Sequence, residues 1–239
     1  KYTGNDYRVI INLVWLRPTQ TKEINIMGTS IVSPKSKTFV PATTSADDDS
    51  IAAAQTPGGA GDLTLAGTAS SFADAGVGLF VTITGDGGTN LTGVNFTITG
   101  TNALGHACSE VRAGPNGAAT VTTTLKFNTV TQIAVSGGTT TAVRAGNAAG
   151  SGGSEQTVFA GRTRLRELFG TTHATANTVT TFFNGGQSQG NQLFAVQNPV
   201  ATQTLINPAS AHGGILANEG LSVNLPTNSF VSLTVYFDG

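Results

Sequence analysis

Hydrophobic and polar residues alternate along the middle of the chain, between Leu79 and Val135. The segments VTITG (81–85) and VNFTITG (94–100) place Val, Ile or Phe on one face and mostly Thr on the other, and each ends in Gly. A period of two residues between turn formers is typical of antiparallel strands with one buried face. Residues 121–127 and 130–135 repeat the pattern, so this stretch is predicted to form four strands.

The same rhythm restarts at Glu155 and continues to Gly239. The final segment FVSLTVYF places Val231, Leu233, Val235 and Phe237 on one face, which predicts a strong closing strand. Short strands at this spacing favour a sandwich or jelly roll of some eighty residues. The Gly/Ser/Ala tract before it, 147–154, predicts a flexible linker between two domains, 46–146 and 155–239.

Helix competes with strand in two segments. Residues 46–55 (ADDDSIAAAQ) allow a short Ala-rich helix, with Asp47, Asp48 and Asp49 at its positive N-terminal end. Three adjacent carboxylates also suggest calcium, but the alternating ligands and the Gly of a calcium-binding loop are absent, which favours solvated charges. The second segment, Arg162–Gly170 (RTRLRELFG), leaves helix and strand open.

The first 45 residues form a distinct N-terminal region. The segment from Tyr7 to Leu16 alternates Val9, Ile11, Leu13 and Trp15 with other residues, which predicts a strand. Beyond it, Pro34 and Pro41 favour an extended arm. Such a basic arm suits docking to a larger partner, although an ordinary first strand and loop is equally consistent. The partner-binding candidates here and in the second basic segment are Arg8, Trp15, Arg17, Lys22, Lys35, Lys37, Arg162, Arg164 and Arg166.

Composition narrows the function classes. Only 10% of the residues are charged, against about one quarter in ordinary domains, and the net charge is −1. Neither nucleic acid nor an anionic membrane is therefore an expected partner. No apolar run reaches the length of a membrane-spanning helix. The single Cys108 leaves no internal disulfide and no cysteine-based zinc site.

No motif in the chain predicts catalysis or a cofactor. GDGG (85–88) joins two strands and lacks the Lys-Ser/Thr of a phosphate loop. His106, Cys108 and Glu110 alternate along one predicted strand, where a mixed trio of this kind more often lies across a pleated surface than binds a metal. The three histidines have no GxSxG or HExxH motif around them. The expectation is a non-enzymatic protein with no metal and no cofactor.

Several segments carry a family resemblance. IAAAQTPGGAGDLTLAGT, VTITGDGG, VNFTITGTNALGHACSEVRAGPNG and TTTLKFNTVTQIAVSGG resemble an immunoglobulin-like β-sandwich module that recurs in structural proteins of tailed bacteriophages. The resemblance covers about 51–146 and rests on strand and turn residues. The part from LRELFG to the end is similar, more weakly, to small β-sandwich virion proteins. The expected fold is all-β, with an immunoglobulin-like sandwich followed by a jelly-roll-like one.

The resemblance implies a virion component, made in the host cytoplasm and displayed on the capsid surface. Its expected partner is the major capsid protein or another virion protein, and a homotrimer is usual for such proteins. The short chain lacks the repeats or heptads of a fibre shaft, and its basic arm suits gripping a capsid lattice. A head decoration, or cement, protein is therefore favoured.

The alternative is a tail, neck or head-fibre component that binds a host receptor or glycan. Exposed aromatic and amide side chains on a loop are what such a binding tip would need. The best candidates for that role are Phe182, Phe183, Asn184 and Gln187, in FFNGGQSQGN.

Overall fold

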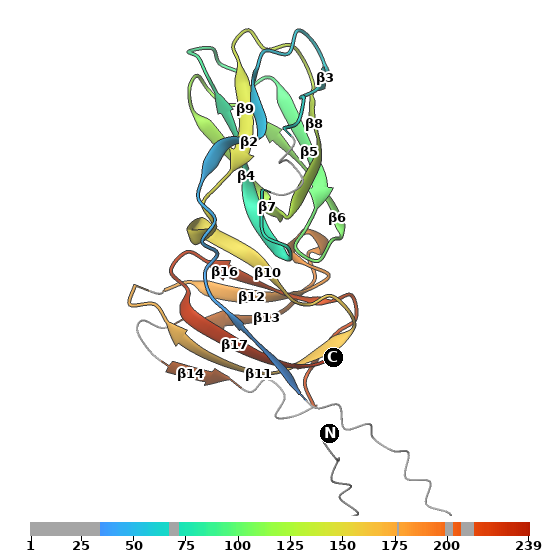
Figure 1. Cartoon of the computed structure of the whole chain (residues 1–239), viewed down its shortest axis with the longest axis vertical. Helices are drawn as coiled ribbons and strands as arrows, with labels where there is room; N and C mark the ends of the chain where they lie inside the picture. Colours follow the sequence, from blue (N-terminus) through green and yellow to red (C-terminus); the bar gives the residue numbers. More distant parts are fainter. Residues whose placement is uncertain (1–33, 67–71, 176, 199–202, 207–212) are drawn as a thin grey trace, which may run out of the picture. The chain divides into compact units, whose positions relative to one another are not determined.

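The computed structural model describes residues 34–66, 72–175, 177–198, 203–206 and 213–239, and its strands pair antiparallel throughout this part of the chain (Figure 1). The all-β prediction is confirmed. The strands are β1 Lys35–Phe39, β2 Asp47–Gln55, β3 Gly61–Asp62, β4 Val77–Gly85, β5 Asn95–Thr101, β6 Ala107–Ala113, β7 Thr120–Phe127, β8 Thr129–Val135, β9 Val143–Asn147, β10 Gly153–Phe159, β11 Thr163–Thr172, β12 Val179–Asn184, β13 Gln192–Gln197, β14 Gln203–Ile206, β15 Ile215–Ala217, β16 Leu221–Pro226 and β17 Phe230–Asp238. Two single-turn 3₁₀ helices are η1 Gly150–Gly152 and η2 Gln187–Gln189. None of the described helices is long or apolar enough to span a membrane.

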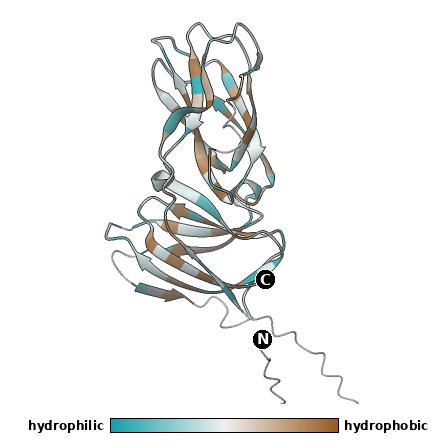
Figure 2. Ribbon diagram, viewed as in Figure 1, coloured by the Kyte–Doolittle hydropathy of each residue, from teal (hydrophilic) through white to brown (hydrophobic). Residues whose placement is uncertain are grey.

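The first sandwich encloses the alternating residues of the central stretch. Strands β7, β4, β9 and β2 form one of its sheets, and β3, β8, β5 and β6 form the other. On β5, Phe96 and Ile98 are fully buried while Thr97 and Thr99 are half-buried, so the period of two separates a core face from an outer face. Hydropathy alternates in the same way along neighbouring strands (Figure 2).

The second sandwich joins the two ends of the described chain. One sheet has the order β1-β17-β11-β14, with β15 also paired to β11, and the facing layer is β13-β12-β16-β10. Strand β1 lies beside β17, with Lys35 opposite Phe237 (Figure 1). On β17, Leu233, Val235 and Phe237 are buried as the sequence predicts. Val231, predicted on the same face, is 55% exposed, because the register shifts between Thr171 and Thr172 and leaves Val231 out of the pairing with β11. Residues 35–39, expected in a separate arm, thus complete a sheet of this sandwich.

A short strand pairing connects the two sandwiches. Strand β10 pairs with β16 over most of its length and with β4 at only two positions, Glu155 opposite Gly78 and Gln156 opposite Val77. The buried hydrophobic residues nevertheless form two separate clusters, one in each sandwich. Polar contacts therefore have a large part in holding the sandwiches together.

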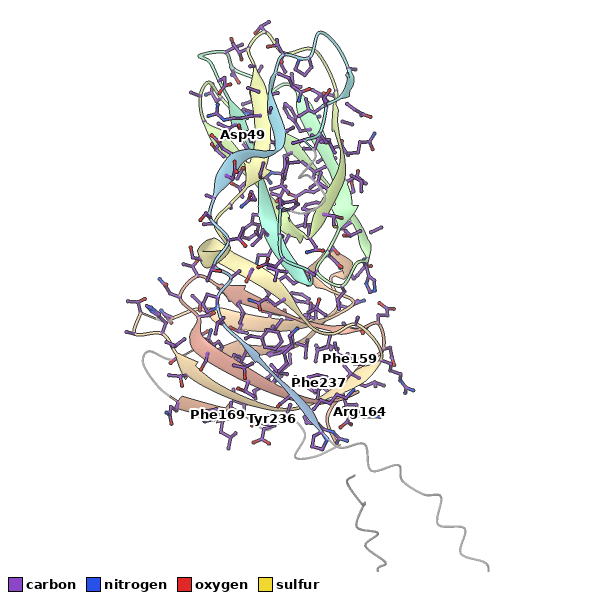
Figure 3. All side chains as sticks on the ribbon, viewed as in Figure 1. Asp49, Phe159, Arg164, Phe169, Tyr236 and Phe237 are labelled. Atoms are coloured by element: carbon purple, nitrogen blue, oxygen red, sulfur yellow. The ribbon has the colours of Figure 1, made fainter. Side chains whose placement is uncertain are left out.

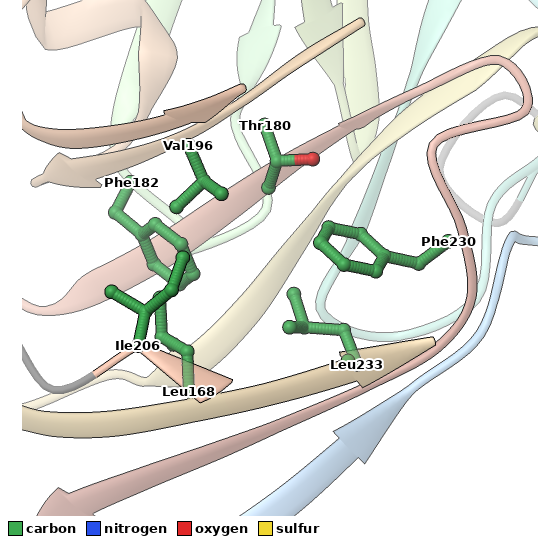
Figure 4. Close-up of a pocket in the computed structure, with 8 residues that line it drawn as sticks. Leu168, Thr180, Phe182, Val196, Ile206, Phe230 and Leu233 are labelled. Carbon is green, nitrogen blue, oxygen red and sulfur yellow. The ribbon is translucent and has the colours of Figure 1, made fainter. Parts of the chain in front are cut away.

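The core of the second sandwich contains a small apolar cavity (Figure 4). Leu168, Phe182, Val196, Phe230 and Leu233 are among its lining residues, and its volume is about 10 Å³. A cavity of that size is about the smallest that can hold one water molecule. It is a packing defect and not a ligand site.

The structure decides the two segments in which helix competed with strand. The segment 47–55 is strand β2 and not a helix, because Ile51 and Ala52 are buried in the first core. The segment 163–172, left open between helix and strand, is strand β11.

Candidate functional site

The predicted partner-binding residues fall into two groups. Arg8, Trp15, Arg17 and Lys22 lie outside the described residues. The other five lie in the second sandwich: Lys35 and Lys37 are on β1, Arg162 directly precedes β11, and Arg164 and Arg166 are on β11.

The structure brings three of these cations to one end of a single sheet. Strand β17 separates β1 from β11, with Lys35 opposite Phe237 and Arg164 opposite Asp238. Arg162 and Arg164 line an open cleft of about 270 Å³ that Leu216 and Asp238 also border. Arg164 lies at the same end of the sandwich as Phe159 and Phe237 (Figure 3). We call Lys35, Arg162 and Arg164 the basic end.

The cations of the basic end have no carboxylate partner among the described residues. Lys35 Nζ lies 5.4 Å from the centre of the Phe159 ring, a cation–π contact that leaves the ammonium charge uncompensated. Arg162 and Arg164 make no hydrogen bond or ion pair within the described chain. Their charges are available to an external anionic group.

Arg166 and Lys37 have partners within the chain. The Arg166 guanidinium binds the Asp238 carboxylate at 2.6–2.9 Å and donates to the Gly213 carbonyl. The hydrogen bond to Asp238 raises the pKa of Arg166. Lys37 Nζ donates to the Thr157 carbonyl at 2.6 Å, and burial lowers its pKa. These two residues hold the fold together more than they offer charge to a partner.

A second polar centre lies between the sandwiches, and sequence reasoning missed it. Glu155 of β10 is fully buried and accepts hydrogen bonds from Ser222 Oγ at 2.6 Å and from the Gln187 N–H at 2.7 Å. Lys126 of β7 is only 3% exposed, donates to Asn224 Oδ1 and lies 4.6 Å from the Phe80 ring centre. We call Glu155 and Lys126, with the residues that bond them, the junction cluster.

Burial shifts both charged groups of the junction cluster toward their neutral forms. It lowers the pKa of Lys126 to about 8, although the nearby Glu155 carboxylate opposes this shift. It also raises the pKa of Glu155, against hydrogen bonds from Ser222 and Gln187 and the charge of Lys126. Taking charges out of water is costly unless they are paired, and Glu155 Oε2 has no hydrogen-bond partner in the described part of the chain.

Further hydrogen bonds across the junction come from one turn of the first sandwich. Asn102 Nδ2 donates to the Gly185 carbonyl and to Ser188 Oγ, both at 2.9 Å. His106 Nδ1 lies 2.9 Å from the same carbonyl. A Cβ on Gly186 would lie 2.3 Å from Asn102 Nδ2, and its φ is +96°, so only glycine fits this contact without strain. The turn at 102–106 thus has a second role as a docking element.

The trio His106, Cys108 and Glu110 does not converge on one point. His106 contacts Gly185, whereas the Glu110 carboxylate accepts from the Thr124 and Leu125 backbone N–H groups at 2.7–3.0 Å. Burial raises the pKa of the Cys108 thiol to about 12, so it carries little thiolate at neutral pH. Their positions fit the interpretation of a pleated surface.

Within the described residues, Asp47, Asp48 and Asp49 are the one group of three acidic, His or Cys side chains whose ligand atoms lie close together, within 4.8 Å. Asp48 is ion-paired to Arg144 Nε at 2.7 Å, and Arg144 also binds Asp86. Proximity to Asp47 raises the pKa of Asp49. All three carboxylates are exposed, which fits a partly paired surface cluster.

Three of the four residues considered for glycan binding have internal contacts. Phe182 is fully buried in the second core. Asn184 Oδ1 accepts from the Glu219 N–H at 2.8 Å, and the Gln187 N–H donates to Glu155. The fourth, Phe183, is half-buried, so these residues do not form a platform of two exposed aromatic rings.

Comparisons of the chain with protein-family models, with curated proteins and with solved structures gave no match. The immunoglobulin-like and jelly-roll-like assignments and the resemblance to phage proteins stay predictions.

Proposed function

We propose that this chain is a non-enzymatic structural protein of a bacteriophage particle. In this proposal it is a decoration protein that binds the outside of the head shell, through the major capsid protein or another virion protein, and stabilises it. The basic end carries the proposal, because it offers three cations without an ion-pair partner among the described residues, at one end of the second sandwich. Such a surface would bind an acidic patch of the shell, with charge complementarity setting the approach and orientation.

The charge of the N-terminal segment agrees with an acidic partner. Residues 1–33, which precede β1 in the chain, contain Lys1, Arg8, Arg17 and Lys22 against two acidic residues, Asp6 and Glu23. An acidic shell surface would therefore attract this segment as well as the basic end.

Reconstitution on particles that lack this protein tests the proposal. Purified protein is added to such particles, bound copies are counted by co-sedimentation, and resistance of the particles to heat is followed by DNA release. We expect saturable binding, affinity that falls with rising salt, and a higher bursting temperature. Absence of binding to shells, or binding without stabilisation, would contradict decoration.

A matched pair of charge reversals locates the contact. Arg164→Glu lies at the basic end, whereas Arg112→Glu reverses an arginine of β6 that forms an ion pair with Glu110 at 3.6 Å. We expect Arg164→Glu to weaken binding by about tenfold or more, as for charges at a complementary interface. Arg112→Glu should bind like the unaltered protein. Equal affinities for the two variants would remove the basic end from the contact.

Imaging of intact particles separates this function from the alternative of a tail, neck or head-fibre component. Copies spread over the whole shell would support decoration. A few copies at one vertex or along the tail, together with saturable binding of the purified protein to host cells, would favour the alternative.

A further inference from the structure

The sheet β1-β17-β11-β14 packs one face on the core of the second sandwich. No second layer of described residues covers its other face. Leu233, Val235 and Phe237 point into the core, so their neighbours Ser232, Thr234 and Tyr236 point outward. Thr234 is opposite Phe169, Phe169 is opposite Leu205, and Thr38 completes this central row. We call these residues, with Glu167 and Thr171, the outer face.

The centre of the outer face carries two exposed apolar side chains that lie next to each other. Phe169 is 42% exposed and Leu205 is 64% exposed, and they are direct cross-strand neighbours. Val231 at one end of β17 is 55% exposed, and Val40, which follows β1, is 54% exposed. Phe169 and Tyr236 extend from the sheet on the side away from Phe237 (Figure 3). Grouped apolar side chains of this kind mark interaction surfaces.

The outer face carries little charge, which allows it to pack against the same face of a second copy of the chain. Glu167 is the one acidic or basic residue in the three central rows, which otherwise hold Ser, Thr, Gln, Tyr, Phe and Leu. Thr38 Oγ1 and Thr234 Oγ1 bond each other at 2.9 Å, which satisfies part of the hydrogen-bonding capacity of these hydroxyls within the sheet. Two such faces can meet without opposing blocks of like charge, as a self-complementary interface requires.

The size of the outer face fits a weak, concentration-dependent contact. Its four strands, β1, β17, β11 and β14, have 5, 9, 10 and 4 residues. At about 3.3 Å per residue and about 4.8 Å between strands they cover roughly 440 Å². Two such faces would bury about 900 Å² in total, which lies in the range of weak and transient interfaces, below about 1,200 Å².

We propose that the outer face is the surface through which copies of this chain associate, with Phe169 and Leu205 at the centre of the contact. The occupant is a second copy and not a segment of the same chain. This inference uses none of the residues of the basic end and does not depend on binding to a capsid.

Molar mass in solution tests the proposal. One chain has a mass of 24.2 kDa. Sedimentation equilibrium over about 1–100 µM, a range that covers micromolar association, should give a mass that rises with concentration to at least twice this value. Phe169→Asp and, separately, Leu205→Asp should weaken association by about 30-fold or more, the effect of losing an interface hot spot.

Val111→Asp is the matched control. Val111 of β6 is 58% exposed on the first sandwich, so it offers the same substitution at similar exposure away from the outer face. Circular dichroism and thermal unfolding establish that all three variants are folded. The proposal is overturned if the unaltered protein is a monomer throughout the range, or if Val111→Asp dissociates the protein as strongly as Phe169→Asp.

Deletion of residues 1–33 distinguishes the remaining occupant. If the N-terminal segment of the same chain covers the outer face, the full chain will be a monomer and the deletion variant will associate. That result would also overturn the proposal. Association of both forms, lost in each with Phe169→Asp, would support it.

Discussion

The lysine of the junction cluster makes a quantitative prediction about alkaline stability. Lys126→Met replaces the lysine by an unbranched side chain one atom shorter and removes the charge that the fold buries. Its absolute effect at neutral pH combines opposing contributions: relief of desolvation, loss of the contact with Phe80, and an Asn224 oxygen left without its donor. The dependence on pH isolates the first of these.

The magnitude follows from the pKa shift. Burial lowers the pKa of Lys126 from 10.5 to about 8, and each unit corresponds to about 1.4 kcal/mol. Between these two values the unfolded chain holds a proton that the folded chain has lost, so stability increases with pH. The contribution is fully present above pH 10.5 and is lost as the pH falls through about 8. From pH 7 to 10.5 the unaltered protein should therefore gain about 3 kcal/mol relative to Lys126→Met.

Urea unfolding of both proteins at pH 7.0, 8.5 and 10.5, pH values that span the shift, measures this difference. Cys108 and Lys37 also titrate in alkaline solution, but they are common to both proteins and cancel in the comparison. Repeating the comparison in a Glu155→Gln background removes the response of that carboxylate to the loss of its neighbour. If the difference between the two free energies of unfolding stays constant with pH, within about 0.5 kcal/mol, the Lys126 ammonium is not desolvated in the folded protein.

Three other substitutions test further parts of the fold. Glu155→Gln should gain stability relative to the unaltered protein as the pH rises from acid to neutral. The raised pKa of Glu155 gives the unaltered protein stability that is present below the unfolded pKa and is lost as the pH rises through the folded pKa. Unfolding of both proteins at pH 4 and 7, values chosen around the ordinary pKa, measures this, and a difference that does not change with pH would refute it. Phe96→Ala removes a fully buried ring of the first core and should cost about 3–5 kcal/mol in urea unfolding, so a loss below about 1 kcal/mol would contradict the core assignment. Gly186→Ala should destabilise the protein by at least about 1 kcal/mol and so lower its thermal midpoint, because Gly186 has a positive φ and contacts Asn102. Gly88→Ala serves as the control, since its new Cβ meets nothing within 4 Å.

Alternation along the chain was sufficient to predict the strands of the central stretch and the closing strand. Phe96 and Ile98 on β5, and Leu233, Val235 and Phe237 on β17, are buried as their period of two requires. A local pattern is reliable here because each strand needs only one apolar face, and every second residue along the strand lies on that face. The helix considered at 47–55 was wrong because burial of Ile51 and Ala52 outweighed local helix preference.

The candidate sites were predictable only in part. Clustering along the sequence singled out Lys35, Arg162 and Arg164, but it did not distinguish them from Arg166, which is paired with Asp238 some seventy positions later. The sequence around Lys126 and around Glu155 does not predict that both side chains are buried. Their burial results from the meeting of β4, β7, β10 and β16 at the junction.

The amino-acid sequence by itself determined the all-β class, the period of the strands and the scarcity of charge, because each is a property of neighbouring residues or of composition. The tertiary structure decided which strands share a sheet, and so placed β1 beside β17, left Phe169 beside Leu205 on an open face, and enclosed Lys126 with Glu155. Those outcomes depend on contacts between residues far apart in the chain. Antiparallel pairing is specified by packing and register across strands, and a local pattern does not contain that information.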